Sequence, residues 1–329
     1  MELHESMMVN CSQRFQVEAT TLNKLAMSSP TEEIKRPFRI IIVGGGIAGL
    51  SAAIALRGPN RTITILEQSS FLREVGAAIS LQPNATKILE QRWGVGVDEP
   101  ASCPRIVDRG FRIYSTAAGG QLVGEIPLTK GKADYGADRV IYHRRDLHAL
   151  LLHAATATAA PTPARPHNTP AALIRLRARV MKCDAEAGSV TVLAGGDGDG
   201  GDGQGTAATT TTTLTADLIV AADGIHSALR ATVLRADDDD EGAVAVPTGL
   251  AAYRFTLPIA RLRAACPAFA ARIDPAAPYT SMVVGDGDRQ DDVRRLVMGP
   301  CRTDAGDRDK GDRQAARPTT NGKDGKVML

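Results

Sequence analysis

A set of glycines directly after a short apolar segment constrains the fold of this chain more than any other feature. Residues 38–43 read FRIIIV, a β-branched run typical of a buried parallel strand. Residues 44–49 follow with the spacing G-x-G-x-x-G, and the Ala- and Leu-rich residues 50–56 predict a buried helix. Residues 61–67 predict a second strand. The chain is therefore predicted to contain a βαβ unit of a doubly wound α/β fold.

Three glycines and one acidic residue of this unit predict a dinucleotide site. Gly44 permits a tight turn, Gly46 lets the backbone approach a pyrophosphate, and Gly49 allows close helix–strand packing. Glu67 ends the second strand about 20 residues later, where a carboxylate can accept hydrogen bonds from the adenosine ribose. This fingerprint does not distinguish FAD from NAD.

Length, charge and composition exclude several classes of function. The chain has 329 residues, enough for one large or two ordinary domains, and its 43% apolar residues allow a sizeable core. A net charge of +2 and only 4% aromatic residues argue against a nucleic-acid-binding or membrane-surface protein. No run of about 18 apolar residues occurs, so no membrane span is predicted.

The cysteines favour a reducing, cytoplasmic compartment. Their number is odd, their spacings are wide and no C-x-x-C occurs, so we predict neither a disulfide framework nor a zinc site. His143, His148 and His226 match no metal-ligand spacing. We therefore predict no metal site and expect these histidines to be structural.

Three further segments follow the glycine fingerprint. Residues 73–80 read REVGAAIS and lead into LQPNA, where Pro83 predicts the start of a helix. Residues 143–148 read HRRDLH and open a second predicted helix. Residues 222–230 read ADGIHSALR and follow a strand predicted over residues 217–222.

Together with the fingerprint, these segments resemble FAD-dependent aromatic monooxygenases of the salicylate-hydroxylase type, especially those of fungal secondary metabolism. The resemblance extends over about residues 38–302. It implies a doubly wound Rossmann-type FAD-binding domain interleaved with a smaller antiparallel β substrate domain. It also implies that NADH or NADPH reduces FAD, and that O₂ supplies the oxygen atom that hydroxylates a small aromatic or polyketide-derived substrate.

The resemblance assigns further cofactor contacts. Ala78, the small residue after Val-Gly-Ala, would lie against the flavin, and Arg144 would approach the cofactor. Arg145 carries the same charge and could take the place of Arg144. Asp223 and Gly224 would support both FAD and the nicotinamide donor. Alternatively, Asp223 simply caps the turn after its strand, because Asp-Gly is a common turn pair.

Tyr253 and Arg254, within AAYRFTLPI, are the predicted catalytic residues. In the family, the corresponding segment belongs to the substrate-side sheet, and its arginine can hold a phenolate or carboxylate near the flavin. A guanidinium suits this role, because it offers a fixed fork of donors and stays charged. The alternative is a strand arginine that faces water.

Composition shifts and the resemblance together predict the organisation of the chain. The predicted segments are a polar N-terminal extension (1–37, with Met27 as an alternative start), an FAD-binding domain (38–106 and 140–235) with a low-complexity insert (194–213), a substrate domain (107–139 and 245–302) and a disordered tail (303–329). Residues 173–180 alternate between apolar and arginine side chains, which predicts one half-buried antiparallel strand.

One segment implied by the resemblance is not found. In its C-terminal third, the family carries Gly-Asp followed by Ala, His and Pro, which binds the ribityl chain and pyrophosphate of the flavin. The Gly-Asp pairs within residues 285–288 and at residues 306–307 lack this continuation. We therefore expect the C-terminal part of the FAD site to be incomplete.

Two other functions stay open at this point. The chain could be a non-catalytic remnant of such a flavoprotein that keeps the ADP-binding half. It could also be an NAD-dependent Rossmann dehydrogenase, although the Asp-Gly and His-Arg-x-Asp-Leu segments would then be unexplained.

Overall fold

The computed structural model describes most of the region that carries the motifs. The described residues are 36–70, 77–96, 105–158, 169–194, 210–234, 246, 248, 251–271, 277–285, 295–302 and 326–328. The predicted N-terminal extension up to residue 35, residues 195–209 of the predicted insert and residues 303–325 of the predicted tail lie outside them.

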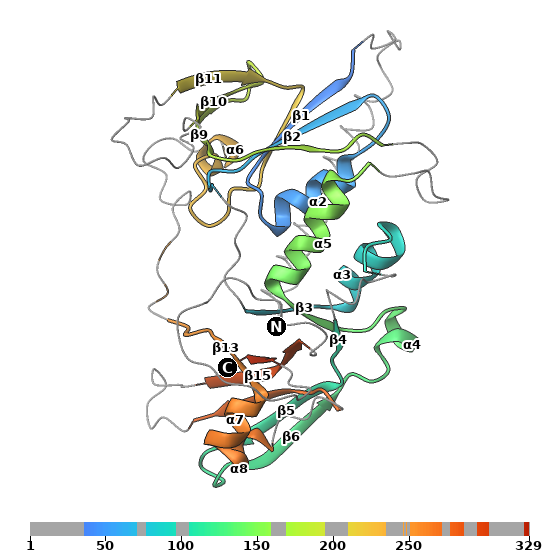
Figure 1. The fold of residues 1–329 in the computed structure, drawn as a ribbon, viewed down its shortest axis with the longest axis vertical. Helices are drawn as coiled ribbons and strands as arrows, with labels where there is room; N and C mark the ends of the chain where they lie inside the picture. Colours follow the sequence, from blue (N-terminus) through green and yellow to red (C-terminus); the bar gives the residue numbers. More distant parts are fainter. Residues whose placement is uncertain are drawn as a thin grey trace, which may run out of the picture. The chain divides into compact units, whose positions relative to one another are not determined.

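A four-stranded sheet in the order β12-β1-β2-β8 carries the glycine fingerprint (Figure 1). Its strands are β1 (Phe38–Val43), β2 (Arg61–Leu66), β8 (Leu173–Arg175) and β12 (Leu218–Ala221). β1 pairs in parallel with β12, and β2 pairs in parallel with β8. Helix α2 (Ile47–Leu56) connects β1 to β2, which confirms the predicted βαβ unit. Ile40, Ile42 and Ile65 are at most 2% exposed, as expected for strands covered on both faces.

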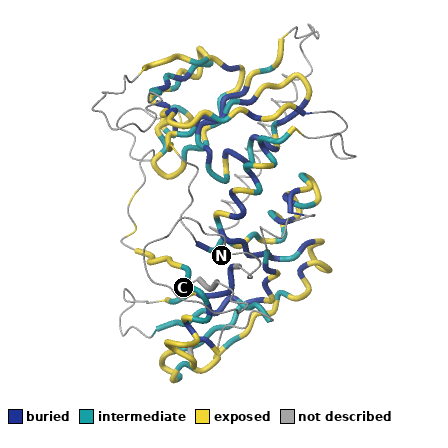
Figure 2. Tube along the Cα trace, viewed as in Figure 1, coloured by how far each residue is buried: buried dark blue, intermediate teal, exposed yellow. Residues whose placement is uncertain are grey.

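A three-stranded antiparallel sheet shares a core with the parallel sheet. Its strands, in the order β11-β10-β9, are β9 (Ala178–Asp184), β10 (Ser189–Ala194) and β11 (Thr210–Thr215). One buried cluster contains Val43 and Leu66 from the parallel sheet and Val180, Val190 and Val192 from the antiparallel one. Figure 2 shows this burial on the facing strands.

Two sequence-based predictions are wrong in this region. Residues 173–180 do not form a single antiparallel strand, because β8 pairs in parallel with β2 and the backbone then turns at Arg177, whose φ is 53°. Leu176, expected on a buried face, is 42% exposed at this turn. Residues 210–213, predicted to belong to the insert, form part of β11 and pair with β10. Threonine is β-branched, which suits it to a strand.

Helix α5 (Arg144–Thr156) packs against α2 and follows a small sheet in the order β3-β7-β4. The strands of this sheet are β3 (Ala78–Leu81), β4 (Ile106–Val107) and β7 (Val140–His143). β3 and β7 are antiparallel, with Ala78 opposite His143 and Leu81 opposite Val140. Pro83 begins α3 (Pro83–Lys87), as predicted, and a π-helical turn η1 (Ile88–Arg92) continues it.

Buried Arg57 ties the end of α2 to the end of α5. It donates from Nε to the Pro170 carbonyl at 3.0 Å, and from Nη2 to the carbonyls of Ala157 at 2.5 Å and Thr169 at 3.0 Å. Its Nη1 donates to the Ala154 carbonyl. These bonds satisfy carbonyls at a helix end that have no partner within the helix. The entry into β8 is thereby held beside both helices.

A six-stranded sheet contains segments from distant parts of the chain. Its order is β13-β16-β15-β14-β5-β6, with bounds β5 (Gly110–Ser115), β6 (Gln121–Pro127), β13 (Thr256–Pro258), β14 (Thr280–Val284), β15 (Arg295–Arg302) and β16 (Lys326–Met328). Helices α7 (Ile259–Ala265) and α8 (Pro267–Ala270) follow β13, while α4 (Gly131–Tyr135) follows β6 and α6 (Arg230–Leu234) follows β12. The strands of this sheet come from segments before β7 and after β12, which confirms the predicted interleaving of a Rossmann-type part with a β-rich part.

This sheet differs from the predictions at two places. The pairing of β14 with β5 is parallel, so the sheet is mixed and not wholly antiparallel. Residues 326–328, predicted to be part of a disordered tail, form β16 between β13 and β15. Their Lys-Val-Met sequence is short, and the strand depends on both of its neighbours.

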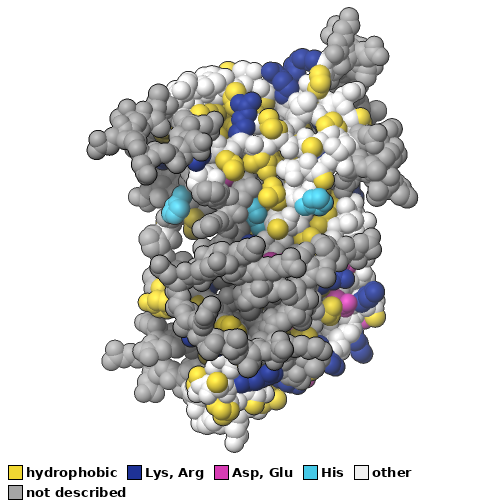
Figure 3. All heavy atoms as spheres, viewed as in Figure 1, with side chains coloured by type: hydrophobic (Ala, Val, Ile, Leu, Met, Phe, Trp, Pro, Cys, Tyr) yellow, Lys and Arg dark blue, Asp and Glu magenta, His cyan; other side chains and the backbone are white. Residues whose placement is uncertain are grey.

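The described surface carries scattered charge. On the face that Figure 3 shows, Lys and Arg side chains stand at separate places among the described atoms, with hydrophobic side chains between them. Among the described helices, none has the length and apolar character that a membrane crossing requires.

Candidate functional site

A crevice at the carboxyl ends of β1, β2 and β12 brings together five of the eight predicted cofactor-binding residues. Its volume is about 540 Å³, and its lining includes Gly44, Gly46, Glu67, Asp223 and Gly224. In open α/β sheets, ligands bind outside the carboxyl ends of the strands. We call this space the dinucleotide crevice.

The three fingerprint glycines have three different surroundings. Gly44 has φ +107°, and a Cβ there would lie 2.8 Å from the Ala222 carbonyl carbon. A Cβ on Gly49 would collide with the Gly44 carbonyl oxygen. Around Gly46, by contrast, no heavy atom lies within 4 Å of an added Cβ among the described residues. Gly44 and Gly49 are therefore required by packing, whereas Gly46 leaves room for a ligand.

The start of α2 fits a pyrophosphate. Its N-cap is Gly46, no side chain caps it, and its first turn holds no acidic residue. The amide groups of this turn and the positive end of the helix dipole are suited to bind an anion. With the open space at Gly46, the residues present fit the phosphate portion of FAD.

Glu67 is held in place by both its backbone and its side chain. Its amide donates to the Arg175 carbonyl at 2.9 Å, and its carbonyl accepts from the Ala178 amide at 2.9 Å. Its carboxylate accepts hydrogen bonds at 2.8 Å from the amides of Gly45 and Ser69. The carboxylate is thus oriented over the fingerprint loop, where a ribose could reach it.

Asp223 organises the Asp-Gly turn. Its carboxylate accepts hydrogen bonds from the Ser227 hydroxyl at 2.7 Å and from the Ala228 amide at 2.8 Å. Arg230 donates to the Ile225 carbonyl at 2.8 Å, which closes the same turn. Gly224, at φ +81°, supplies the left-handed backbone conformation that the turn needs. The turn-capping role weighed from the sequence is therefore present.

Ala78 and Arg144 form a second cluster. Ala78 begins β3 and pairs with His143, the residue before Arg144. The Arg144 amide donates to the Ala77 carbonyl at 2.7 Å, so helix α5 starts beside this end of β3. Arg144 is half-buried and Arg145 is exposed, which favours Arg144 as the inward-facing arginine.

His148 connects the two clusters through a contact that the sequence did not predict, in keeping with the structural role expected for it. It lies one helical turn after Arg144 on α5, is 4% exposed, and its Nε2 is 2.8 Å from the Gly45 carbonyl oxygen. Glu67 therefore binds the amide of Gly45, while His148 binds its carbonyl. The i, i+4 spacing from Arg144 was the signal in the sequence that could have identified His148.

Arg179 is a second residue that the sequence reasoning missed. The alternating pattern placed it on a solvent face, but it lines the dinucleotide crevice from β9. Its guanidinium adds positive charge to a space that contains the Glu67 and Asp223 carboxylates. The turn at Arg177, which the pattern did not predict, brings it there.

The structure does not bring Tyr253 and Arg254 to either cluster. Tyr253 is 91% exposed, and Arg254 is exposed beside it in the segment before β13. Neither residue lines the dinucleotide crevice. Their predicted catalytic role stays a prediction.

Comparisons with known proteins agree with this geometry. A model of the NAD(P)-binding Rossmann-like domain matches residues 42–123. The FAD-dependent monooxygenase atnJ of Arthrinium sp is 37% identical over 222 residues, which are 68% of this chain and 43% of that protein. Hispidin-3-hydroxylase of Neonothopanus nambi is 33% identical over 219 residues, or 66% of this chain and 43% of that protein. The chain thus spans less than half the length of these relatives.

Solved structures share the fold. The oxygenase of 2-methyl-3-hydroxypyridine-5-carboxylic acid matches 89% of this chain and 58% of its own, with 20% identity and a TM-score of 0.52. CtdE, solved in complex with FAD and a substrate, matches 88% of this chain and 57% of its own, with 18% identity and a TM-score of 0.53. The predicted fold class and the resemblance to FAD-dependent monooxygenases are both confirmed.

Proposed function

We propose that this chain, which carries the Rossmann-like dinucleotide-binding part of an FAD-dependent aromatic monooxygenase, binds FAD and serves hydroxylation of an aromatic or polyketide-derived ring with NADH or NADPH and O₂. The observation that carries the proposal is the arrangement of seven predicted cofactor residues in two clusters joined by α5. Gly44, Gly46, Glu67, Asp223 and Gly224 line one crevice, and Ala78 and Arg144 form the second cluster.

Each part of the arrangement has a separate task. The amides at the start of α2 bind the pyrophosphate, and Glu67 accepts hydrogen bonds from the adenosine ribose. Arg144 supplies fixed positive charge at the flavin end, and Ala78 leaves space there because its side chain is small. When bound, FAD supplies the redox chemistry and the activation of O₂, and the protein positions the substrate and excludes water.

The substrate side of the proposal rests on the six-stranded sheet. Residues 107–139 and 245–302 contribute β5, β6, β13, β14 and β15 to it, which supports their assignment as a substrate domain. We assign Arg254, with Tyr253 beside it, the role of holding an ionised phenol. The fungal sources of the relatives support a role in secondary metabolism, and the cysteine usage supports a cytoplasmic location.

FAD binding by the purified full-length chain tests the proposal. We would titrate FAD, follow its visible absorption bands after removal of unbound cofactor, and compare Glu67→Gln with Glu186→Gln. Both substitutions remove one carboxylate, but Glu186 is an exposed residue in the turn between β9 and β10. We expect Glu186→Gln to match the parent chain and Glu67→Gln to bind FAD about tenfold more weakly, because a hydrogen bond to a charged group contributes roughly 1.5–3 kcal/mol.

The same titration separates the alternatives. A chain that stays colourless with added FAD overturns the proposal. If that colourless chain still binds ADP by calorimetry, and Glu67→Gln weakens ADP binding, the non-catalytic remnant is the better description.

A further inference from the structure

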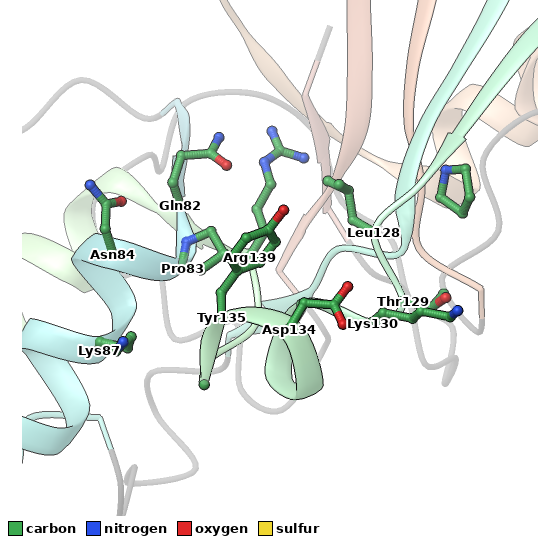
Figure 4. A pocket seen from close by; sticks show the side chains of 13 residues that line it. Gln82, Pro83, Asn84, Lys87, Leu128, Thr129, Lys130, Asp134, Tyr135 and Arg139 are labelled. Atoms are coloured by element: carbon green, nitrogen blue, oxygen red, sulfur yellow. The ribbon is translucent and has the colours of Figure 1, made fainter.

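A second pocket lies at the opposite end of the β3–β7 ladder from Ala78 and Arg144. Its volume is about 1070 Å³, and Figure 4 shows the side chains around it. Its walls are the start of α3, the chain from the end of β6 through α4, and Arg139 just before β7. We call it the ladder pocket. None of the residues predicted to bind the cofactor lines it.

The ladder pocket has unbalanced positive charge. Lys87 and Lys130 line it, and neither ammonium group has an ion-pair partner among the described residues. Asp134 is the carboxylate in the lining, and it offsets one of the two charges. An anionic ligand is therefore favoured over a cationic one.

The ladder pocket also has apolar walls. Pro83, Leu128 and the ring of Tyr135 line it together with the lysines. In Figure 4, the side chains of Gln82, Tyr135 and Arg139 extend toward the same region of the pocket. A flat apolar body that carries an oxyanion matches this lining better than an inorganic anion does.

Arg139 forms a buried part of the pocket wall. It is 5% exposed and forms a buried ion pair through Nη1 with Asp108. Its Nη2 donates to the Ser80 hydroxyl at 2.9 Å, and Thr280 donates to the Asp108 carboxylate at 2.7 Å. Its Nε, however, has no hydrogen-bond partner among the described residues.

An unpaired buried donor is costly, roughly 1–3 kcal/mol. Burial lowers the pKa of the Arg139 guanidinium below its ordinary value, and an arginine side chain stays charged at neutral pH. The guanidinium therefore adds positive charge to the pocket wall, and Asp108 balances this charge.

The ladder register gives the length of such a ligand. Ala78 and Leu81 are three residues apart on β3, and their partners His143 and Val140 are three apart on β7. At about 3.4 Å per residue, the Ala78 end of the ladder, where the flavin is predicted, and the Leu81 end, beside the pocket, are roughly 10 Å apart. A single benzoate ring is too short to reach both ends, whereas a two-ring molecule can.

We propose that the ladder pocket binds the oxyanion end of an elongated, two-ring aromatic substrate whose reacting ring lies at the Ala78–Arg144 end. This inference rests on the proposed function and narrows its substrate class. Lys87 and Lys130 attract the oxyanion, and Tyr135 and Leu128 contact the distal ring.

Calorimetric binding to the full chain, with and without FAD, tests the proposal with three probes. These are 4′-hydroxybiphenyl-4-carboxylate, its uncharged carboxamide and 4-hydroxybenzoate. We expect the biphenyl carboxylate to bind about tenfold more tightly than either of the others. Equal affinity of the biphenyl carboxylate and 4-hydroxybenzoate would overturn the length argument, and with it the proposal.

Three lining variants and one control locate the binding. Lys87→Met and Lys130→Met should each weaken binding of the biphenyl carboxylate several-fold and leave binding of the carboxamide unchanged. Asp134→Asn should tighten binding of the carboxylate. Lys182→Met, an exposed lysine of β9, is the control. Carboxylate affinity that is unchanged in all three lining variants would contradict the assignment of the pocket.

The proposed function and the ladder pocket can fail independently. A chain that binds FAD but does not prefer the biphenyl carboxylate refutes the ladder pocket and leaves the proposed function standing. A colourless chain refutes the proposed function, and lysine-dependent carboxylate binding by that chain would still support an oxyanion site at the pocket.

Discussion

The dinucleotide crevice and the ladder pocket are built in opposite ways. Backbone atoms shape the crevice: a turn at Gly44, an open approach at Gly46 and the amides of α2. Side chains shape the pocket, and the buried Arg139 in its wall is held by residues from β3, β14 and the segment before β5. A site made of backbone is specified by local glycine spacing, whereas a site made of side chains depends on contacts between distant segments.

Removing the charge of Asp108, which holds Arg139 in the wall of the ladder pocket, should give the largest loss of stability. Asp108 is 1% exposed and accepts from Arg139, Thr280 and the Gly110 amide. Asp108→Asn leaves the Arg139 charge uncompensated, so we expect the free energy of unfolding to fall by about 4 kcal/mol. Chemical denaturation measures this loss.

Asp134→Asn is the matched control, because Asp134 is an exposed acid of the same pocket. It should change stability by less than about 0.5 kcal/mol. Similar losses in both variants would show that Asp108 has no special role in holding Arg139.

Two glycine substitutions test the crevice side. Gly49→Ala places a methyl group against the Gly44 carbonyl, and we expect a loss of about 3 kcal/mol in stability from overpacking. Gly46→Ala meets open space, so its melting temperature should stay close to that of the parent chain while FAD binding weakens. Thermal denaturation and FAD titration of both variants separate the structural glycine from the ligand-facing one.

The same contrast explains how much could be predicted from the sequence. The βαβ unit, the crevice residues and the start of α3 at Pro83 followed from local patterns, because strand burial, glycine spacing and proline preference act over a few residues. The turn at Arg177, the pairing of residues 210–213 and the strand at residues 326–328 were missed. Each depends on a neighbouring strand that is distant in sequence.

The candidate site shows the same division. Seven of the eight predicted cofactor residues fall into two clusters, and the eighth, Gly49, packs beneath the fingerprint loop. Arg179 and Arg139 were not identified, because alternation along a strand and a lone arginine in a loop carry no information about the surface that they will face. Tyr253 and Arg254 came from a resemblance alone, and the described geometry gives them no partner site.

His148 tests whether the crevice depends on one side chain after all. His148→Phe keeps an aromatic ring but removes the partner of the buried Gly45 carbonyl, which costs about 1–3 kcal/mol. We expect FAD to bind roughly tenfold more weakly, because the fingerprint loop loses one of its two anchors. His153→Phe, at an exposed position of the same helix, should have no effect on FAD affinity.

A role for His148 in positioning the loop predicts one further result. His148→Gln, which keeps a side-chain donor, should restore part of the FAD affinity. If His148→Phe binds FAD as tightly as the parent chain, the fingerprint loop is held by its backbone alone.

Arg179 should give a smaller change. Arg179→Met removes positive charge from the crevice mouth, and we expect ADP affinity to fall about threefold at low ionic strength and less at high salt, because exposed charges are screened. Arg175→Met, an exposed arginine of β8 that does not line the crevice, is the control. Equal effects in the two variants would indicate general electrostatics and no specific contact.

The smallest expected effect compares thiols in the two regions. Cys183 on β9 packs against the core beside the crevice, and Cys266 is exposed after α7. Burial, with a smaller contribution from Asp184, raises the pKa of the Cys183 thiol. At pH 8 we expect iodoacetamide to modify Cys183 roughly threefold more slowly than Cys266, because the thiolate is the reactive form.

The sign of the linked stability effect follows from the same pKa shift. A raised pKa in the folded chain means that folding favours the protonated thiol. The stability that this preference contributes is fully present below the pKa of the unfolded chain and is lost as pH rises through the pKa of the folded chain. Added FAD should slow the modification of Cys183 further, because ligand binding suppresses local opening, and should leave Cys266 unchanged. Peptide mass spectrometry after timed quenching measures both rates. Equal protection of the two thiols by FAD would mean that the crevice and the six-stranded sheet open as one unit, and the two regions would then differ in construction but not in stability.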